Sequence, residues 1–235
     1  MIILIALSPY CPIALKFLCY TQIKKERLMY FDRKCKITFI CNGSTIYSED
    51  YRLTDSENYP PLSDYGTEEI EKICEFLKKR GVKNDKIYSS PALRSTQSAD
   101  MIAKLFKQDF EIVPDLHPRK CGKFNGLTFT QIEEKYPEML EKMINNPDIP
   151  TPEDAESISN FIQRVKHTIN EIIEQNQGNR IIIVTHRDVI KAAVCSALNM
   201  PDSSLHRIYI KSGSATQISY FERWASLVYC DYTVV

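Results

Sequence analysis

Residues 180–186 read Arg-Ile-Ile-Ile-Val-Thr-His, a continuous apolar run that ends on two polar residues. Such a run is typical of a central strand in a parallel sheet, because that strand is buried on both faces. Before it, apolar residues recur at helical spacing from about residue 157 to 175, and after it residues 188–198 return to a helical pattern. The run therefore predicts a buried strand between two helices, as in an α/β fold.

Strand-like and helix-like segments alternate through the rest of the chain as well. Helical patterns follow the capping residues Ser63 and Thr128 and the proline Pro91. The other strand-like runs are residues 35–41, 87–90, 111–116 and 208–221, the last as one strand or as a hairpin around 212–214, and the predicted loops are residues 44–61 and 145–152. We therefore predict an α/β, single-domain protein with a mostly parallel central sheet and helices on both faces.

Composition narrows the function classes. The chain has 235 residues, enough for one ordinary domain, and its 30 basic residues balance 30 acidic ones. No basic excess exists that would favour nucleic acid as a partner. Eight cysteines and four histidines are scattered without ligand spacing, so we expect buried thiols in a reducing, cytoplasmic compartment, no metal site and no cofactor.

The first 34 residues differ from the rest of the chain, and we assign them to an N-terminal extension before a domain over residues 35–235. The extension is apolar up to Tyr20 but is interrupted by Pro9, Pro12 and Lys16, so it is a poor membrane span. Its basic residues follow the apolar run, whereas a signal peptide has them before it. We expect a disordered extension or an overlong start, with a weak anchor as the alternative, and we do not expect membrane association of the domain.

Polar residues stand where the predicted parallel strands end. Asn42 and Gly43 follow the first strand, Ser89 and Ser90 close the second, and His186 closes the strand at 180–186. Ligands of open α/β sheets bind at these carboxyl ends, so the residues should meet at one edge. With Arg94 close behind the second strand, the set predicts an anion pocket of phosphate size.

Four separated segments resemble the histidine phosphatase superfamily, the phosphoglycerate mutase-like group. They occur in the family's order and spacing, and the match spans about residues 36–223. The segments are Pro-Leu-Ser-Asp-Tyr-Gly at 61–66, Tyr-Ser-Ser-Pro-Ala-Leu-Arg-Ser-Thr-Gln-Ser-Ala at 88–99, Gly-Lys-Phe-Asn-Gly-Leu-Thr at 122–128 and Ile-Val-Thr-His at 183–186. The resemblance implies a phosphate pocket of two arginines and two histidines, in which one histidine of an Arg-His-Gly motif attacks phosphorus and a carboxylate protonates the leaving oxygen.

The sequence departs from the family pattern at the centre of this pocket. Asn42 stands at the position of the nucleophilic histidine, and Cys41 at that of the first phosphate-binding arginine. Pro118 occupies the position of the acid, and Arg187 replaces the small residue after the second histidine. Arg94 and His186 match the family, so the resemblance implies half of the original phosphate pocket, together with the backbone of Gly43.

These departures favour a pseudophosphatase that binds a phosphorylated small molecule or a protein partner without turnover, in an undefined oligomeric state. An asparagine amide is not a nucleophile at neutral pH. The alternative is an active phosphatase or mutase on small phosphorylated metabolites with a rearranged pocket. It would need a Cys41 thiolate as nucleophile, His117 as proton donor or Arg187 as the missing cation.

Overall fold

The computed structural model describes residues 33–55, 60–145 and 152–234 and contains one six-stranded sheet. The strand order is β3-β2-β4-β1-β5-β6, in which β3, β2, β4 and β1 run parallel and β5 and β6 are antiparallel. The strands are β1 (Arg33–Cys41), β2 (Lys86–Ser89), β3 (Glu111–Ile112), β4 (Arg180–Thr185), β5 (Ala215–Phe221) and β6 (Ala225–Tyr232). The predicted mostly parallel α/β domain is confirmed.

The two most apolar strands lie side by side at the centre of the sheet. In β1 and β4, Ile37 pairs with Ile181 and Phe39 pairs with Ile183, and all four side chains are buried. β1 begins at Arg33, so it includes two residues that the sequence assigned to the extension. The remainder of that extension lies outside the described residues.

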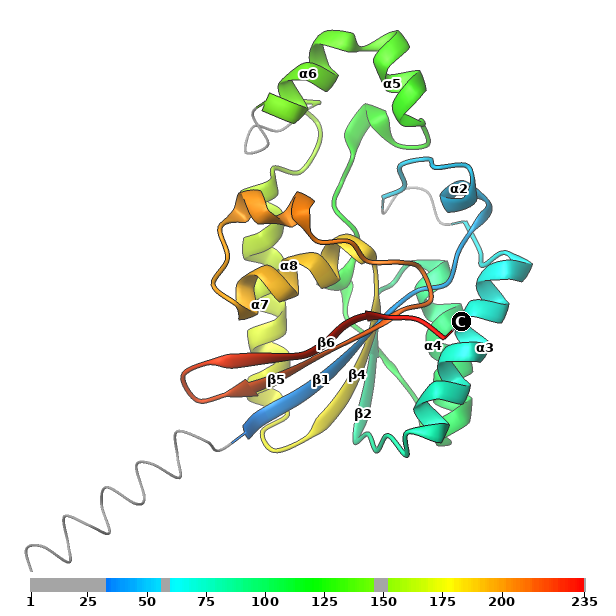
Figure 1. The fold of residues 1–235 in the computed structure, drawn as a ribbon, viewed down its shortest axis with the longest axis vertical. Helices are drawn as coiled ribbons and strands as arrows, with labels where there is room; N and C mark the ends of the chain where they lie inside the picture. The colour runs from blue at the N-terminus through cyan, green and yellow to red at the C-terminus, as the bar shows by residue number, and fades with distance from the viewer. Residues whose placement is uncertain (1–32, 56–59, 146–151, 235) are drawn as a thin grey trace, which may run out of the picture.

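Helices cover both faces of the sheet, as predicted (Figure 1). On one face, α3 (Asp64–Lys79) and α4 (Leu93–Phe106) enclose a core that includes Ile40 and Ile182. On the other, α7 (Ile158–Gln175) and α8 (Arg187–Ala197) pack on Phe39 and Ile183. Because neighbouring residues of a strand point to opposite faces, one apolar run supplies both cores.

The predicted helix starts are set by local capping. Ser63 and Ser157 accept hydrogen bonds from the backbone N–H groups of Gly66 and Asn160 at the starts of α3 and α7. Thr128 forms the predicted capping box with Gln131 and opens α5 (Phe129–Lys135), which is followed by α6 (Pro137–Asn145). Three short 3-10 helices lie between these elements in the described residues: η1 (Pro114–Leu116), η2 (Gly122–Phe124) and η3 (Asp202–Arg207).

Two predicted elements were wrong in extent. The strand expected over residues 111–116 ends at Ile112, and Pro114 begins η1, because proline has no N–H to continue a ladder. The loop expected over residues 44–61 contains a short helix, α2 (Ile46–Glu49), whose capping box is made by Thr45 and Ser48. Residues 146–151 of the predicted second loop lie outside the described residues.

The expected hairpin around residues 212–214 was also misplaced. Those residues form a turn before β5, with Gly213 at a φ of +57°. The hairpin joins β5 to β6, and the backbone N–H of Phe221 donates to the carbonyl oxygen of Trp224 at 2.9 Å. Within the described ranges, no helix combines the length and the apolar character needed to cross a bilayer.

Candidate functional site

A cavity of about 200 Å³ lies at the carboxyl edge of the sheet. Asn42, Arg94 and His186 all line it, although they follow three different strands. The cavity is also lined by Cys41, Pro118 and Arg187, so six of the seven candidate residues are brought together. Parallel strands produce this result because their carboxyl ends meet at one edge.

His186 is a buried polar group of the cavity. It stands directly before α8 and is 4% exposed. Its Nε2 atom lies 2.7 Å from Ser90 Oγ and 3.4 Å from Ser95 Oγ. Burial, and then the positive charge of Arg94, hold the pKa of His186 well below its ordinary value. The imidazole is therefore neutral at pH 7 and acts as a hydrogen-bonding group rather than as a cation.

Arg94 supplies a buried positive charge in the first turn of α4. Its side chain is 4% exposed and lines the cavity. A guanidinium is fully charged and presents several N–H donors in one plane, a shape that matches phosphate oxygens. Arg94 therefore gives the cavity a preference for anions.

Asn42 and Cys41 offer no nucleophile at the end of β1. The backbone of Asn42 extends the strand by donating to the carbonyl oxygen of Thr185 at 2.8 Å, and its Nδ2 donates to the carbonyl oxygen of Gly43 at 2.9 Å. The Cys41 side chain is 2% exposed, and burial raises the pKa of its thiol to about 12. A thiol with that pKa is protonated at pH 7, so the proposed thiolate role of Cys41 lacks support.

Gly43 does not line the cavity, and the expected role of its N–H in binding an anion needs correction. That N–H already donates to Ser98 Oγ at 3.3 Å. A side chain here would also clash, because an added Cβ would lie 2.2 Å from the carbonyl oxygen of Gly66. Gly43 is therefore required by the close approach of two backbone segments.

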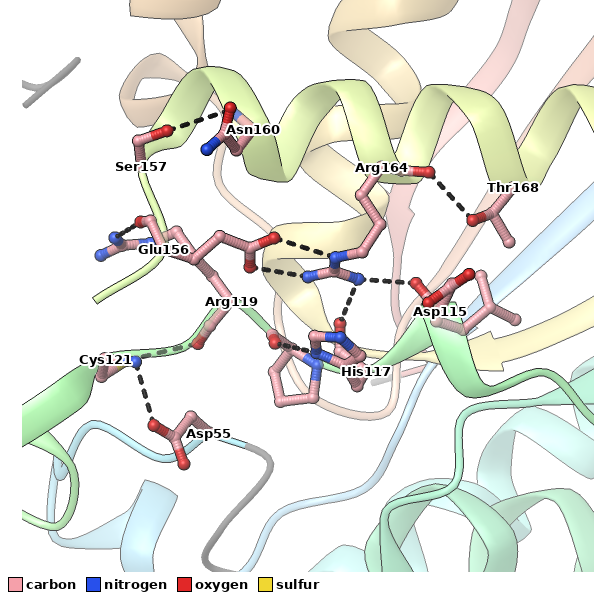
Figure 2. Close-up of polar contacts among 12 residues, drawn as sticks. Asp55, Asp115, His117, Arg119, Cys121, Glu156, Ser157, Asn160, Arg164 and Thr168 are labelled. Carbon is pink, nitrogen blue, oxygen red and sulfur yellow. Dashed lines mark hydrogen bonds and ion pairs between the residues drawn. The ribbon is translucent and has the colours of Figure 1, made fainter. Parts of the chain in front are cut away.

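Pro118 lines the cavity. The segment around Asp115 and His117 that precedes it is held by Arg164 of α7 (Figure 2). Arg164 on α7 donates to the carbonyl oxygens of Asp115 and His117 at 2.6 and 3.1 Å. The same guanidinium forms a two-point contact with Glu156 at 2.9 and 2.8 Å. The His117 ring contacts the carbonyl oxygen of Pro118 through Nδ1 at 2.7 Å and is not among the lining residues, so it is not placed as a substitute acid.

Two further arginines line the cavity, and one of them was not predicted from the sequence. Arg187 lies at the start of α8 and its exposed guanidinium donates to Ser212 Oγ at 3.2 Å. Arg52, from the loop after α2, lines the cavity while its Nη1 donates to the carbonyl oxygen of Gly126 at 3.0 Å. Arg52 does not follow a strand, so the strand-end pattern gave no signal for it. With Arg94, three guanidinium groups line this cavity.

The mouth of the cavity carries exposed aromatic rings. Tyr51 is 81% exposed and Phe129 is 52% exposed, and both line the cavity. In the described part of the chain, no group of three or more His, Cys, Asp or Glu side chains is placed to hold a metal ion. Together with the three arginines, these rings give the cavity a cationic lining with an aromatic rim.

The architecture and this cationic edge define an α/β protein of the phosphoglycerate mutase-like class. The family profile described as histidine phosphatase superfamily (branch 1) matches residues 37–231. The chain therefore belongs to the histidine phosphatase superfamily.

Several proteins of known name are similar to the chain. A bifunctional protein of Mycobacterium tuberculosis is 26% identical over 193 residues, which cover 82% of this chain and 52% of that protein. The chain thus spans about half the length of the curated relatives of this kind. A metal-independent phosphoserine phosphatase of Arabidopsis thaliana is 29% identical over 159 residues, 67% of this chain and 66% of that protein.

Solved structures share the fold. An alpha-ribazole phosphatase from Shigella flexneri superimposes with a TM-score of 0.76 at 21% identity, over 84% of this chain and 96% of that chain. A phosphoserine phosphatase from Entamoeba histolytica in complex with 3-phosphoglyceric acid gives a TM-score of 0.73 at 20% identity, over 85% and 98% of the two chains.

Proposed function

We propose that this protein binds a phosphorylated ligand in the cavity at the carboxyl edge of the sheet and does not hydrolyse it. The observation that carries the proposal is the buried Asn42 amide, which lines the same cavity as Arg94 and His186. The cavity keeps the anion-binding side chains Arg94 and His186, but the residue at the position of the family's nucleophilic histidine is an amide.

The chemistry of the lining opposes turnover. Asn42 cannot form a phosphoenzyme, Cys41 is a protonated thiol, and Pro118 has no proton to give to a leaving oxygen. Loss of a nucleophile costs on the order of 10⁶ in turnover in enzymes whose catalytic residues act as a unit. The reaction of the family should therefore be absent.

Binding is less affected than catalysis. Arg94, Arg52 and Arg187 line the cavity, and the neutral His186 can exchange a hydrogen bond with an oxygen of the ligand. Among the described residues of the lining, Asp188 is the one carboxylate, and it lies 3.3 Å from Lys191. Arg52 in turn pairs with Asp50 at 3.4 Å, outside the lining. Related proteins are named as phosphatases of small phosphorylated metabolites, and phosphoserine and 3-phosphoglycerate are therefore suitable first probes.

Titration calorimetry with phosphoserine tests the binding half of the proposal. We expect saturable binding that weakens at least about tenfold in Arg94→Gln, because a buried guanidinium contact to phosphate is lost. Arg207→Gln, which changes the exposed arginine at the end of η3, is the matched control and should bind as the unmodified protein does. Equal binding by all three proteins would move the ligand elsewhere.

A phosphate-ester hydrolysis screen with trapping of phosphohistidine tests the absence of turnover. We expect no turnover above that of buffer and no phosphorylated histidine. The alternative function, an active phosphatase or mutase with a rearranged pocket, is favoured by the retained His186, which is the histidine that it would need. Turnover that disappears in His186→Ala would establish that alternative and overturn the proposal.

A further inference from the structure

The sheet face that packs against α3 changes from apolar to polar toward the starts of the central strands. On β1, Ile40 belongs to the apolar core of this face, and alternation places Thr38 and Lys36 on the same face toward the start of the strand. On β4, Ile182 is likewise in this core, and Arg180 lies on its face two residues earlier. Polar and charged residues thus occupy positions on central strands where a helix would normally cover apolar ones.

A second cavity, of about 340 Å³, lies over this polar part of the face. We call it the basal cavity. Its polar lining is Lys36, Thr38, Arg80, Lys83, Arg180 and Gln217, and the rings of Phe76 and Tyr229 form apolar walls. The end of α3, the loop after it and the starts of β2 and β4 lie at this end of the sheet (Figure 1). Lys36 and Asn42 are six residues apart on one extended segment, or about 20 Å, so the two cavities are separate.

Positive charge in the basal cavity is only partly neutralised. Arg180 pairs with Asp85 through two contacts of 3.1 Å. Lys36, Arg80 and Lys83 have no carboxylate within ion-pair distance among residues 33–55, 60–145 and 152–234. Burial, together with the charges of Arg33 and Arg180, lowers the pKa of Lys36. A bound anion would relieve this repulsion.

The floor of the basal cavity is held in place by hydrogen bonds. Gln217 on β5 donates through Nε2 to Thr38 Oγ1 at 2.9 Å, and both side chains are buried. Tyr229 on β6 also has a side-chain hydrogen bond with Thr38. Polar groups that fix one another in this way present a rigid surface, which lowers the entropy cost of ordering a bound molecule.

We propose that the basal cavity is a second ligand site, which binds a small organic anion with two or more phosphate or carboxylate groups. Three cations without a carboxylate partner match a ligand of several negative charges. The volume limits it to a small molecule, and the aromatic walls accommodate its carbon skeleton. The proposal rests on residues of the basal cavity alone and does not depend on the function proposed for the carboxyl edge.

Pyrophosphate and citrate are the probes, the first for phosphate groups and the second for carboxylates. NMR titration should shift the side-chain amide signals of Gln217 with saturation by either or both anions. In Lys36→Gln and in Lys83→Gln the Kd should rise at least about fivefold, as expected for loss of one charge contact. Lys166→Gln, an exposed lysine of α7 on the opposite face, is the matched control and should leave the Kd unchanged.

A stability measurement separates a binding role of Lys36 from a structural one. Without ligand, Lys36→Gln should raise the midpoint of thermal unfolding, because a partly buried cation among other cations is removed. With pyrophosphate, the increase in midpoint should be smaller in Lys36→Gln than in the unmodified protein. Arg187→Gln alters the first cavity alone and should keep the Gln217 shifts. Absence of Gln217 shifts with both anions, or equal affinity in all four variants, would overturn the proposal.

Discussion

Nε2 of His186 and Oγ of Ser90 lie 2.7 Å apart, and both side chains are buried. The two residues come from the ends of β4 and β2, strands that are neighbours in the sheet. The contact therefore ties the carboxyl ends of two adjacent strands together inside the cavity. It also satisfies the buried neutral imidazole, since a buried polar atom needs a hydrogen-bond partner.

Ser90→Ala removes that partner. We expect the free energy of unfolding to fall by about 1 kcal/mol, because the imidazole Nε2 loses its 2.7 Å hydrogen bond and keeps only the longer contact of 3.4 Å with Ser95 Oγ. Urea unfolding followed by circular dichroism measures the change. The control is Ser203→Ala, since Ser203 is exposed in η3 and should change stability by less than about 0.5 kcal/mol. Similar values for both variants would show that the His186 contact contributes little.

The lowered pKa of His186 predicts a specific dependence of stability on pH. In the unfolded chain this histidine takes up a proton near its ordinary pKa of 6.5, whereas in the folded protein its pKa lies well below that value. The unfolded state therefore binds the extra proton first, and the free energy of unfolding should fall as the pH drops below about 6.5 toward the folded pKa. His186→Gln should reduce this slope in urea titrations between those two values. An unchanged slope would assign the acid sensitivity to other groups.

Gly43→Ala tests the close approach of the backbone after β1 to the start of α3. An added Cβ would lie 2.2 Å from the carbonyl oxygen of Gly66, and neither backbone segment can move without disturbing its hydrogen bonds. We expect destabilisation of about 3 kcal/mol or more in a thermal or urea unfolding experiment. Gly81→Ala is the comparison, since its Cβ meets nothing within 4 Å and only its φ of +57° opposes the change, at a cost of about 1 kcal/mol. Equal effects at the two positions would contradict the packing role of Gly43.

Restoring the family residues should restore chemistry only in combination. Asn42→His alone should give no measurable turnover of an aryl phosphate, since the acid and the first arginine are still absent. Together with Cys41→Arg and Pro118→Glu, it should give detectable hydrolysis, with the phosphoryl group trapped on the introduced imidazole. Arg94 and His186 are already placed, and an acid on the fixed loop contributes about 10²–10⁴ in rate.

The matched control for this experiment is the triple variant with Arg94→Gln added. It should lose the restored turnover, because the buried guanidinium that binds the phosphoryl group is gone. A triple variant that folds but does not hydrolyse the ester would show that Arg187 or the altered loop blocks the phosphate position.

Local physics explains what could be predicted from the sequence. Residues 181–184 are apolar without interruption, since β4 is buried on both faces there. Ser63, Thr128 and Ser157 cap helices through neighbours three residues away. Position in the chain was also sufficient to place Asn42, Arg94 and His186 at one edge, because parallel strands share the direction of their carboxyl ends.

The tertiary structure decided the features that depend on distant partners. β6 is a half-exposed edge strand, so its burial pattern is weak even though Leu227, Val228 and Tyr229 favour a strand. Arg52 reaches the cavity from a loop, and the N–H of Gly43 is taken by a serine 55 residues later. The basal cavity likewise depends on where α3 ends over the sheet. Such features arise from contacts between segments far apart in sequence, whereas strand burial and helix capping depend on residues that are neighbours in sequence.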